Sequence, residues 1–256
     1  MKLCFLGTGA ADYSRELLET VPDRFAPDIR RCSAAILGGK YLIDAGPHVL
    51  DSLRIAGYPA GAVTDLLMTH LHKDHFNPEN IGTLAAGREQ PLRIWVREDA
   101  ELPEIQGTEI RRMKLYERYQ VGSDLAVTGL PANHGQGTRP QHFLMEYAGR
   151  KIYYALDGAW ILNGAFNALK EAHLDLLILD GTCGDYIGDF RLAEHNSIPM
   201  IRMMLPSFAT TGAIDDHTVI YISHLARTLH KSHAETSAIC EASGFHVARD
   251  GLTIEV

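Results

Sequence analysis

The sequence predicts an α/β fold, and three observations lead to this prediction. Short apolar runs rich in Val, Ile, Leu and Tyr recur along the chain, and Gly, Pro or Asp separates them. Stretches with helical spacing alternate with these runs. With 256 residues, the chain is long enough to bury a large core without disulfides or a structural metal. Sheets whose outer faces are covered by helices fit this pattern, and so does a doubly wound sheet.

The apolar runs are the predicted strands. They are Lys2–Gly7, Ser33–Leu37, Tyr41–Asp44, Leu66–Thr69, Leu92–Val96, Asp124–Thr128, His142–Tyr147, Lys151–Leu156, Leu176–Leu179, Val219–Ser223 and Leu252–Glu255. Two of the breaks between them, Gly38-Gly39-Lys40 and Ala148-Gly149-Arg150, are typical of hairpin turns, because glycine accepts the positive φ angles that such turns need.

The stretches with helical spacing are the predicted helices. They are Pro47–Ala56, Pro78–Gly87, Ile161–Ala172, Ser197–Met204 and His233–Ser243. Pro47 and Pro78 suit a first helical turn, and Gly57 and Gly244 suit helix ends. Because no linker, low-complexity tract or short repeat interrupts the chain, we expect a single domain over residues 1–256.

Composition narrows the classes of function. The chain has 24 Lys and Arg against 32 Asp and Glu, a net charge of −8 without a basic block, which disfavours nucleic-acid binding. No apolar run approaches the roughly 20 residues of a membrane span, so no membrane partner is expected. The first residues are typical of a strand rather than a signal peptide. The four Cys lie far apart, which predicts reduced thiols and a cytoplasmic location.

Aspartates and histidines end several predicted strands or follow them closely. Asp44, His70, His134, Asp157 and His224 all lie at such positions. Loops at strand ends are where α/β proteins build sites, because a rigid sheet holds side chains in fixed positions. The chain has the unusual total of 13 His, and their distribution makes these strand ends the candidate site.

The densest group is the run His70-Leu71-His72-Lys73-Asp74-His75, which directly follows a predicted strand. In an extended backbone His70 and His72 point the same way, so their two imidazoles can share a cation. Asp74 and His75 need a bend in the chain to face a second position nearby. Three imidazoles and one carboxylate suit Zn, Mn or Fe. The run therefore predicts a metal site.

This run resembles the signature of the metallo-β-lactamase superfamily, and the other strand-end residues occur in the order of the superfamily's further motifs. The resemblance implies a four-layer αββα sandwich of the metallo-β-lactamase type and two divalent metal ions, either Zn, Mn or Fe. It places His70, His72 and His134 on one ion, and Asp74, His75 and His224 on the other, with Asp157 between them. Asp44 would orient these ligands without binding metal itself.

Within the superfamily, Phe5-Leu6-Gly7-Thr8-Gly9 is similar to phosphodiesterase branches that include the tRNA 3′-end processing endonuclease and the phosphoribosyl cyclic phosphodiesterase. The second branch is closer. Four segments of this chain resemble segments of that phosphodiesterase, namely Arg30-Arg31-Cys32-Ser33, Asp44-Ala45-Gly46-Pro47-His48, Glu194-His195-Asn196 and residues 250–256. One departure is that residues 12–31 contain no Cys, so we predict no structural zinc and do not carry over that enzyme's substrate.

The resemblance therefore implies a phosphodiesterase that acts on a small phosphodiester, cyclic or open, through a hydroxide that bridges two metals. Asp157 and Asp74 would orient the hydroxide, and His195 would protonate the leaving alkoxide as general acid. The candidate contacts to the substrate phosphate are Arg30, Arg31, Ser33 and His48. Solvated loop charges and an ordinary helix-terminal histidine are the alternatives for these four. The resemblance also suggests a homodimer.

Other functions are compatible with parts of this pattern. A thioester or lactone hydrolase would use the same hydroxide to attack a carbonyl carbon. The acidic charge disfavours a tRNA 3′-end endonuclease. A diiron redox protein on this fold would be expected to replace His72 with a carboxylate, and a binding protein without activity would be expected to have lost ligands.

Overall fold

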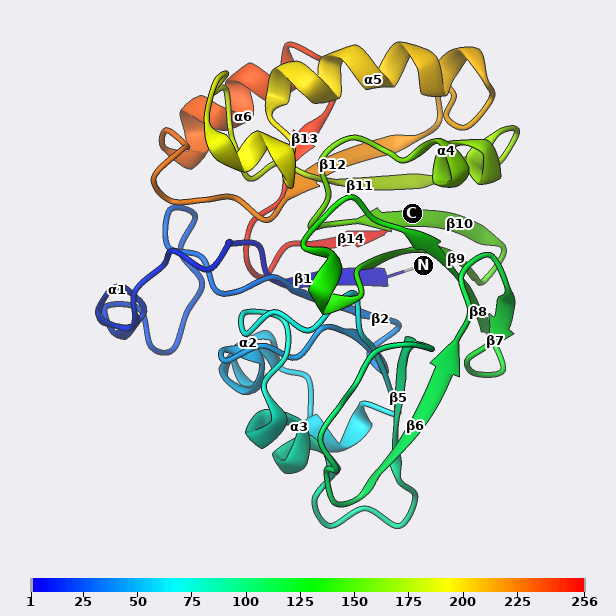
Figure 1. Ribbon diagram of the computed structural model, residues 1–256. Coiled ribbons are helices and arrows are strands. Elements are labelled where there is room, and N and C mark those ends of the chain that lie inside the picture. The colour runs from blue at the N-terminus through cyan, green and yellow to red at the C-terminus, as the bar shows by residue number, and fades with distance from the viewer. Residues whose placement is uncertain (1, 256) are drawn as a thin grey trace. The chain divides into compact units, whose positions relative to one another are not determined.

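The computed structural model describes residues 2–255, which form two compact units (Figure 1). Unit 1 consists of residues 2–114 and 249–255, and unit 2 is Leu115–Ala248. Each unit is built on one seven-stranded mixed sheet. The expectation of a single domain over residues 1–256 stays a prediction. All four Cys are buried and none forms a disulfide within residues 2–255.

The sheet of unit 1 has the order β14-β1-β2-β3-β4-β5-β6. Its strands are β1 (Lys2–Gly7), β2 (Ala34–Leu37), β3 (Tyr41–Ile43), β4 (Asp65–Leu67), β5 (Leu92–Arg97), β6 (Thr108–Met113) and β14 (Thr253–Glu255). Strands β14 to β3 pair antiparallel, and β3 to β6 pair parallel. Because parallel strands share a direction, the segments that follow β3 and β4 lie at the same edge of this sheet.

Helices α2 (Val49–Ala56) and α3 (Pro78–Ala85) cover this sheet through their apolar faces. The other helical segments of unit 1 are α1 (Arg15–Glu19) and η1 (Ala60–Ala62). Val49 and Leu53 of α2 and Ile81 and Leu84 of α3 join one buried apolar cluster with the strand residues, so burial of these side chains holds the helices on the sheet.

The sheet of unit 2 has the order β13-β12-β11-β10-β9-β8-β7. Its strands are β7 (Arg118–Gln120), β8 (Leu125–Pro131), β9 (Gln141–Tyr147), β10 (Arg150–Ala155), β11 (Leu176–Asp180), β12 (Val219–Ser223) and β13 (His246–Val247). Strands β10 to β13 are parallel, and β7 to β10 are antiparallel. The segments that follow β10, β11 and β12 therefore lie at one edge of this sheet.

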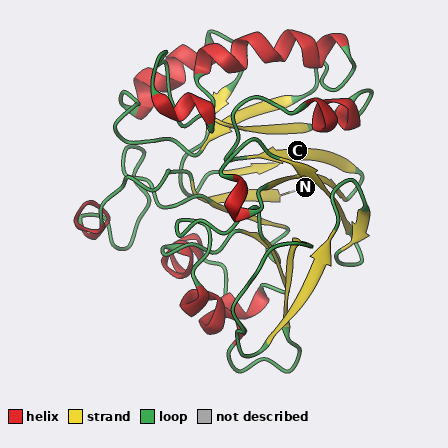
Figure 2. Cartoon of the chain, in the orientation of Figure 1, coloured by secondary structure: helices red, strands yellow, loops and turns green. Residues whose placement is uncertain are grey.

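The helices of unit 2 pack on alternate residues of its strands. They are η2 (Gln136–Thr138), α4 (Asn163–Leu169), η3 (Phe190–Ala193), α5 (Ile198–Thr210) and α6 (His233–Glu241). Leu177 and Leu179 of β11 share an apolar cluster with Ile198, Ile201 and Phe208 of α5. Figure 2 shows that long loops separate these helices from the strands. Within residues 2–255, no helix combines the length and the apolarity that a membrane crossing would need.

The structure confirms the predicted fold class, because two mixed sheets flanked by helices make up the chain. Every predicted strand and helix is present, β1 and β12 with the predicted ends and the others with at least one shifted end. Helix α5 continues past Pro206 to Thr210. Both predicted turns connect antiparallel neighbours. Strands β6, β7 and β13 and the short helix α1 were not predicted.

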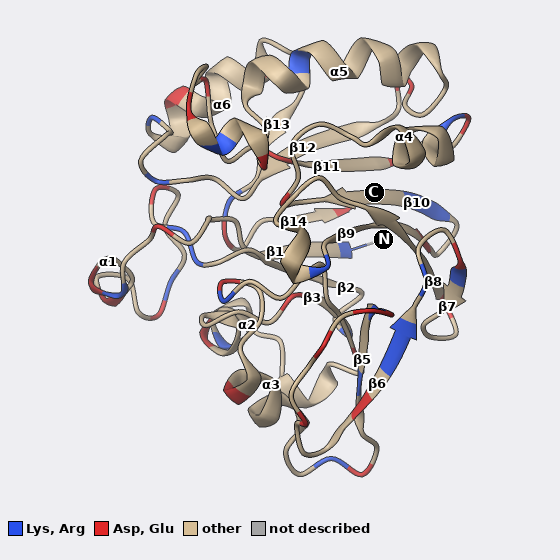
Figure 3. Cartoon of the chain, viewed as in Figure 1, with Lys and Arg blue, Asp and Glu red and all other residues tan. Residues whose placement is uncertain are grey.

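These three strands were missed for a physical reason. Each is an edge strand with a single neighbour in its sheet, and an edge strand needs no continuous apolar face. In β6, Arg111 and Arg112 are exposed, and Figure 3 shows the basic residues along this strand. A polar edge strand lacks the alternation of apolar and polar residues that reveals a strand in a sequence.

Candidate metal centre

The run His70 to His75 forms a compact loop after β4 in unit 1. His70 Nε2 lies 3.0 Å from His72 Nδ1, and the two imidazole rings meet edge to face. The amide of His75 donates to the carbonyl of His72 at 2.9 Å, which makes the bend that the sequence required. This bend brings His75 Nε2 to 3.5 Å from Asp74 Oδ2. The loop thus presents two pairs of potential ligand atoms.

Asp44, which directly follows β3, contacts two of these histidines through the ring nitrogens that are not candidate ligands, either directly or through Thr69. Its Oδ2 accepts from His75 Nδ1 at 2.7 Å and from the Thr69 hydroxyl at 2.7 Å, and its Oδ1 accepts from the Thr69 amide at 2.8 Å. Thr69 Oγ1 in turn lies 3.0 Å from His70 Nδ1. Burial raises the pKa of the Asp44 carboxyl, and the contacts from His75 and Thr69 oppose that shift. This network supports the predicted positioning role of Asp44.

The backbone fixes the loop as well as the side chains do. The Ala45 amide donates to the His75 carbonyl at 2.8 Å, and the Asn77 amide donates to the Ala45 carbonyl at 2.9 Å. A Cβ at Gly46 would lie 1.8 Å from the Asp74 carbonyl oxygen, so only glycine allows this approach. The residues after β3 therefore hold the loop after β4 in place.

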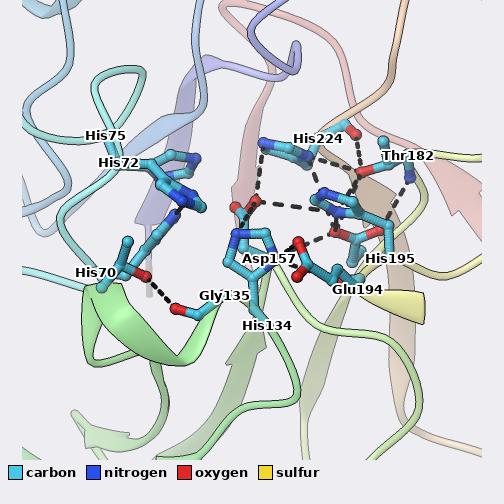
Figure 4. Close-up of polar contacts among 12 residues, drawn as sticks. His70, His72, His75, His134, Gly135, Asp157, Thr182, Glu194, His195 and His224 are labelled. Atoms are coloured by element: carbon cyan, nitrogen blue, oxygen red, sulfur yellow. Dashed lines mark hydrogen bonds and ion pairs between the residues drawn. The ribbon is translucent and has the colours of Figure 1, made fainter. Parts of the chain in front are cut away.

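Unit 2 collects its candidate ligands from separate loops (Figure 4). His224, which follows β12, places Nε2 at 3.2 Å from Asp157 Oδ1, and Asp157 follows β10. His134, which follows β8, places Nε2 at 3.7 Å from the same oxygen. All three side chains are almost completely buried. They converge on one carboxylate oxygen.

The other ring nitrogen of each of these histidines has an acceptor. His224 Nδ1 lies 2.7 Å from the Thr182 hydroxyl, and His134 Nδ1 lies 3.2 Å from the carbonyl oxygen of Glu194. Donation from Nδ1 selects the tautomer whose Nε2 carries a lone pair, and this is the form that binds a metal. In unit 1, His70 and His75 use Nδ1 in the same way.

His195 lies beside the ligand candidates of unit 2, and a carboxylate holds its Nδ1, as Asp44 holds that of His75 in unit 1. Its Nδ1 lies 2.8 Å from Asp180 Oδ2 and 3.9 Å from Asp157 Oδ1. Figure 4 shows the interaction between His195 and Asp157. Burial lowers the pKa of His195, but the charges of Asp180 and Asp157 and the hydrogen bond to Asp180 outweigh burial and raise it to about 9. Burial likewise opposes ionisation of Asp180, yet His195 and His224 lower the pKa of Asp180. The pair is therefore an imidazolium held by a carboxylate at neutral pH.

Three of the candidate residues have a left-handed backbone. Asp44, Asp157 and His224 have φ angles of 61°, 57° and 62°. A residue other than glycine pays roughly 1 to 3 kcal/mol for this conformation, so it persists only where the surroundings enforce it. Each of these residues lies one or two positions after a strand that pairs in parallel with a neighbour. The left-handed conformation turns the chain there, at the edge of the sheet where the candidate ligands lie.

The donor atoms in each unit fit a divalent metal ion. Two ligands of a tetrahedral ion with bonds of about 2.0 to 2.1 Å lie roughly 3.3 Å apart. The four pairs described above have separations of 3.0, 3.5, 3.2 and 3.7 Å. Imidazole and carboxylate donors are the set that Zn, Mn and Fe accept, and they do not distinguish among these metals.

Comparison with known proteins identifies the family. Residues 40–205, about two-thirds of the chain, match the family model described as a beta-lactamase superfamily domain. The chain belongs to this superfamily. The predicted membership of the metallo-β-lactamase superfamily of hydrolases is thereby confirmed. No curated protein sequence matches the chain.

Solved structures of the superfamily share the whole fold. Zn²⁺-bound PqqB from Methylobacterium extorquens is 18% identical, with a TM-score of 0.73 and complete coverage of both chains. A diphosphatase of the PhnP family is also 18% identical at a TM-score of 0.73, covering 100% of this chain and 96% of its own. The short form of human tRNase Z is 22% identical at a TM-score of 0.70, covering 100% of this chain and 99% of its own. At these identities the likeness concerns the fold.

The residues proposed to contact substrate have structural partners in unit 1. Arg30 donates from Nη1 to the Thr8 hydroxyl at 2.6 Å, and Thr8 donates to Asp250 Oδ1 at 2.8 Å. The Arg31 amide donates to Asp250 Oδ2 at 2.7 Å, and its guanidinium donates to the Val21 carbonyl at 3.0 Å. Both arginines are only 3% exposed. Their contact with a substrate stays a prediction.

The other two proposed contacts are partly engaged as well. Ser33 is buried, and its hydroxyl donates to the Gly9 carbonyl at 3.1 Å. His48 accepts from the Cys32 amide at Nδ1, at 3.1 Å, so its Nε2 carries the proton in the neutral ring. Burial lowers the pKa of His48, and the charge of Arg31 adds to this effect. A neutral His48 could donate one hydrogen bond from Nε2.

Sequence reasoning missed two side chains in this site. Asp180 directly follows the predicted strand Leu176–Leu179, so the signal that identified Asp44 and Asp157 was present for it too. Thr182 has no such signal, because a threonine two residues beyond a strand is common. Its role depends on a contact with His224, 42 residues away, which only the folded chain reveals.

Proposed function

We propose that this protein is a metal-dependent hydrolase that cleaves a small phosphodiester. The observation that carries the proposal is the His195–Asp180 pair beside Asp157, with 2.8 Å between His195 Nδ1 and Asp180 Oδ2. It provides a protonated imidazole next to a candidate ligand, as cleavage of an ester with an alkoxide leaving group requires. Two of the similar structures are named as a diphosphatase and a tRNase, and both names concern phosphate-containing compounds.

The residues proposed as ligands of two divalent ions are His70, His72, Asp74 and His75, described in unit 1, and His134, Asp157 and His224, described in unit 2. When bound, Zn, Mn or Fe would supply positive charge to a phosphoryl oxygen and make a water molecule acidic enough to attack near neutral pH.

The remaining steps belong to the side chains. Asp74, whose Oδ2 lies 3.5 Å from His75 Nε2, would orient the attacking water. Asp180 accepts the Nδ1 proton of His195 and keeps the ring charged, so that Nε2–H can protonate the leaving alkoxide. Because the pKa of His195 is about 9, we expect this donor to be lost as the pH rises through that value.

The proposed substrate is a small molecule in the cytoplasm rather than a nucleic acid. The net charge of −8 would repel a long phosphate backbone, and a single phosphodiester needs only local positive charge. We further propose that the enzyme is a homodimer, a state that sedimentation would check directly.

The test compares substrates after removal and reloading of metal. We expect Mn or Zn to restore hydrolysis of bis(p-nitrophenyl) phosphate, with little activity on p-nitrophenyl phosphate or on a thioester. His72→Ala should abolish turnover together with metal binding. On a cyclic phosphodiester, whose leaving group is an alkoxide, His195→Ala should lower kcat by roughly 10²- to 10⁴-fold and retain the metal, whereas the p-nitrophenolate of bis(p-nitrophenyl) phosphate can leave without this proton donor. His173→Ala, on an exposed histidine of unit 2, is the matched control and should match the wild type.

The outcomes separate the alternatives. Turnover of the thioester with an inert diester would move the reaction to carbonyl chemistry on the same ligands. Loss of metal in His195→Ala would make His195 a ligand rather than an acid. Unchanged kcat of that variant on the cyclic phosphodiester would exclude His195 from the reaction.

A further inference from the structure

The turn that follows Asp157 is unusual in its backbone. Asp157 and Trp160 both have left-handed φ angles, 57° and 56°, in a segment of only four residues. Asp157 to Ala159 are buried, so the peptide groups of this turn need partners within the protein. The direction of the Asp157 carboxylate depends on how the turn is held.

The side chain of Asn196 supplies two of these partners. Its Nδ2 donates to the Gly158 carbonyl at 2.9 Å, and its Oδ1 accepts from the Trp160 amide at 2.7 Å. Asn196 is completely buried. A primary amide is suited to this task, because it presents a donor and an acceptor side by side.

The backbone of Asn196 makes a second set of contacts. Its amide donates to Asp180 Oδ1 at 3.1 Å, while the other oxygen of Asp180 lies 2.8 Å from Nδ1 of the adjacent His195. Its carbonyl accepts from the Cys183 amide at 3.0 Å. One residue thus connects the turn after β10, the carboxylate at the end of β11 and the loop that carries His195.

The far side of the turn leaves little room for movement. A Cβ at Gly158 would lie 2.7 Å from Nε2 of His142, whose Nδ1 is 2.9 Å from the Tyr153 hydroxyl. The Asn133 side chain donates to the Ala159 carbonyl at 2.9 Å. The buried His142 ring packs against the turn at Gly158 and limits its movement. Asn196 hydrogen-bonds both to this turn and to Asp180, and so links their positions.

We infer that Asn196 is a positioning residue that sets the placement of Asp157 relative to the His195–Asp180 pair. Its effect on catalysis rests on the proposed function, whereas its effect on metal affinity rests only on Asp157 as a ligand. Replacement of Asn196 should therefore affect two properties together, namely the affinity for Zn²⁺ and the rate of the step that needs His195.

The experiment compares Asn196→Ala and Asn196→Asp with the wild type and with Thr236→Val, which removes a buried hydroxyl of α6. Zn²⁺ affinity is measured by competition with a chelator, and folding is measured by thermal unfolding of the metal-free protein. The values of kcat and KM are measured on a cyclic phosphodiester, whose alkoxide leaving group needs the proton donor. For Asn196→Ala we expect about tenfold weaker Zn²⁺ binding and at least a tenfold lower kcat, with KM within twofold. Thr236→Val should change neither affinity nor kcat.

Each outcome decides the inference. Asn196→Ala with wild-type Zn²⁺ affinity and kcat would overturn it, even if the thermal midpoint fell, because Asn196 would then serve only the fold. If Asn196→Ala does not fold, Asn196→Asp, which keeps the volume and the acceptor for Trp160, gives the same test. Failure of both to fold would also overturn it. A wild type that binds Zn²⁺ but cleaves no diester would refute the proposed function and leave the affinity measurement as the test of Asn196.

Discussion

The two units assemble their candidate ligands in different ways. In unit 1, His70, His72, Asp74 and His75 come from one loop, and the distances among them depend on a few local backbone hydrogen bonds. In unit 2, the ligands follow three different strands and converge on Asp157. The distances among the ligands of unit 1 therefore depend on the sequence of one loop. The distances among those of unit 2 depend on how the sheet places its strand ends.

The local group depends on a close backbone contact, and breaking it gives the largest expected effect. In Gly46→Ala, the new Cβ would lie 1.8 Å from the Asp74 carbonyl, and neither backbone can move without breaking the Ala45–His75 hydrogen bond. We expect the free energy of unfolding to fall by about 4 kcal/mol or more. Urea unfolding of the metal-free protein measures this change.

Gly158→Ala is the counterpart in unit 2. Its Cβ would meet the ring of His142 at 2.7 Å, and a side chain can shift where a backbone cannot. We expect a smaller loss, about 1 to 3 kcal/mol. A Gly158→Ala variant less stable than Gly46→Ala would contradict the view that unit 1 depends on backbone contacts and unit 2 on side chains.

The same contrast explains what the sequence could predict. The run His70 to His75 is visible because all of its ligands are neighbours in the chain, and Asp44 and Asp157 are visible because they end apolar strands. Thr182 and the amide of Asn196 were not identified, because their partners lie 42 and 38 residues away. Asp44, Thr182 and Asn196 all act through tertiary contacts, but only Asp44 ends an apolar strand and could therefore be found from a local pattern.

The fold shows a related limit. The strands with two neighbours are buried and apolar, and the sequence identified them. The polar strand β6 could be recognised only from its pairing with β5, which no local pattern encodes. The relation between the two sheets was expected from a family resemblance rather than from the residues themselves.

Asp180 in unit 2 and Asp250 in unit 1 are both buried, and burial raises the pKa of each, but their net pKa shifts have opposite directions. Asp180 in unit 2 faces two histidines, which lower its pKa against the effect of burial. Asp250 in unit 1 is equally buried, and burial raises its pKa to about 6, although the Arg31 amide, the charge of Arg30 and the Thr8 hydroxyl oppose the shift.

Asp250→Asn tests this difference through the pH dependence of stability. The folded protein holds the Asp250 proton up to about pH 6, whereas the unfolded chain loses it near the ordinary value of 3.8. The folded state therefore binds more protons between these values, and stability should fall as the pH rises through this window, by about 3 kcal/mol. Urea midpoints from pH 4 to pH 7 should show that Asp250→Asn reduces this fall. An unchanged slope would mean that Asp250 is ionised in the folded protein throughout this range.

The two units also differ in the residues that form their hairpin turns, and this difference should have the smallest effect on stability. The turn of unit 1 places Gly38 and Gly39 at φ angles of 59° and 71°, and the turn of unit 2 places Ala148 and Gly149 at 50° and 78°. Both connect antiparallel strands, so both backbones need positive φ at two successive residues. Unit 2 fills one of these positions with a residue whose Cβ disfavours it.

Ala148→Gly should therefore stabilise the protein slightly. Relief of the left-handed strain outweighs the extra freedom of glycine in the unfolded chain, and the net gain is about 0.5 kcal/mol. Gly38→Ala makes the reverse change in unit 1 and should cost about 0.5 kcal/mol, because it introduces the same strain and the same restriction of the unfolded chain. Thermal unfolding resolves both, since 1 kcal/mol corresponds to roughly 2 to 4 °C for a chain of this size. Ala148 is exposed, so its substitution disturbs no packing. A loss of stability in Ala148→Gly would contradict the prediction, because it would show that the positive φ of Ala148 costs less free energy than the added freedom of glycine in the unfolded chain.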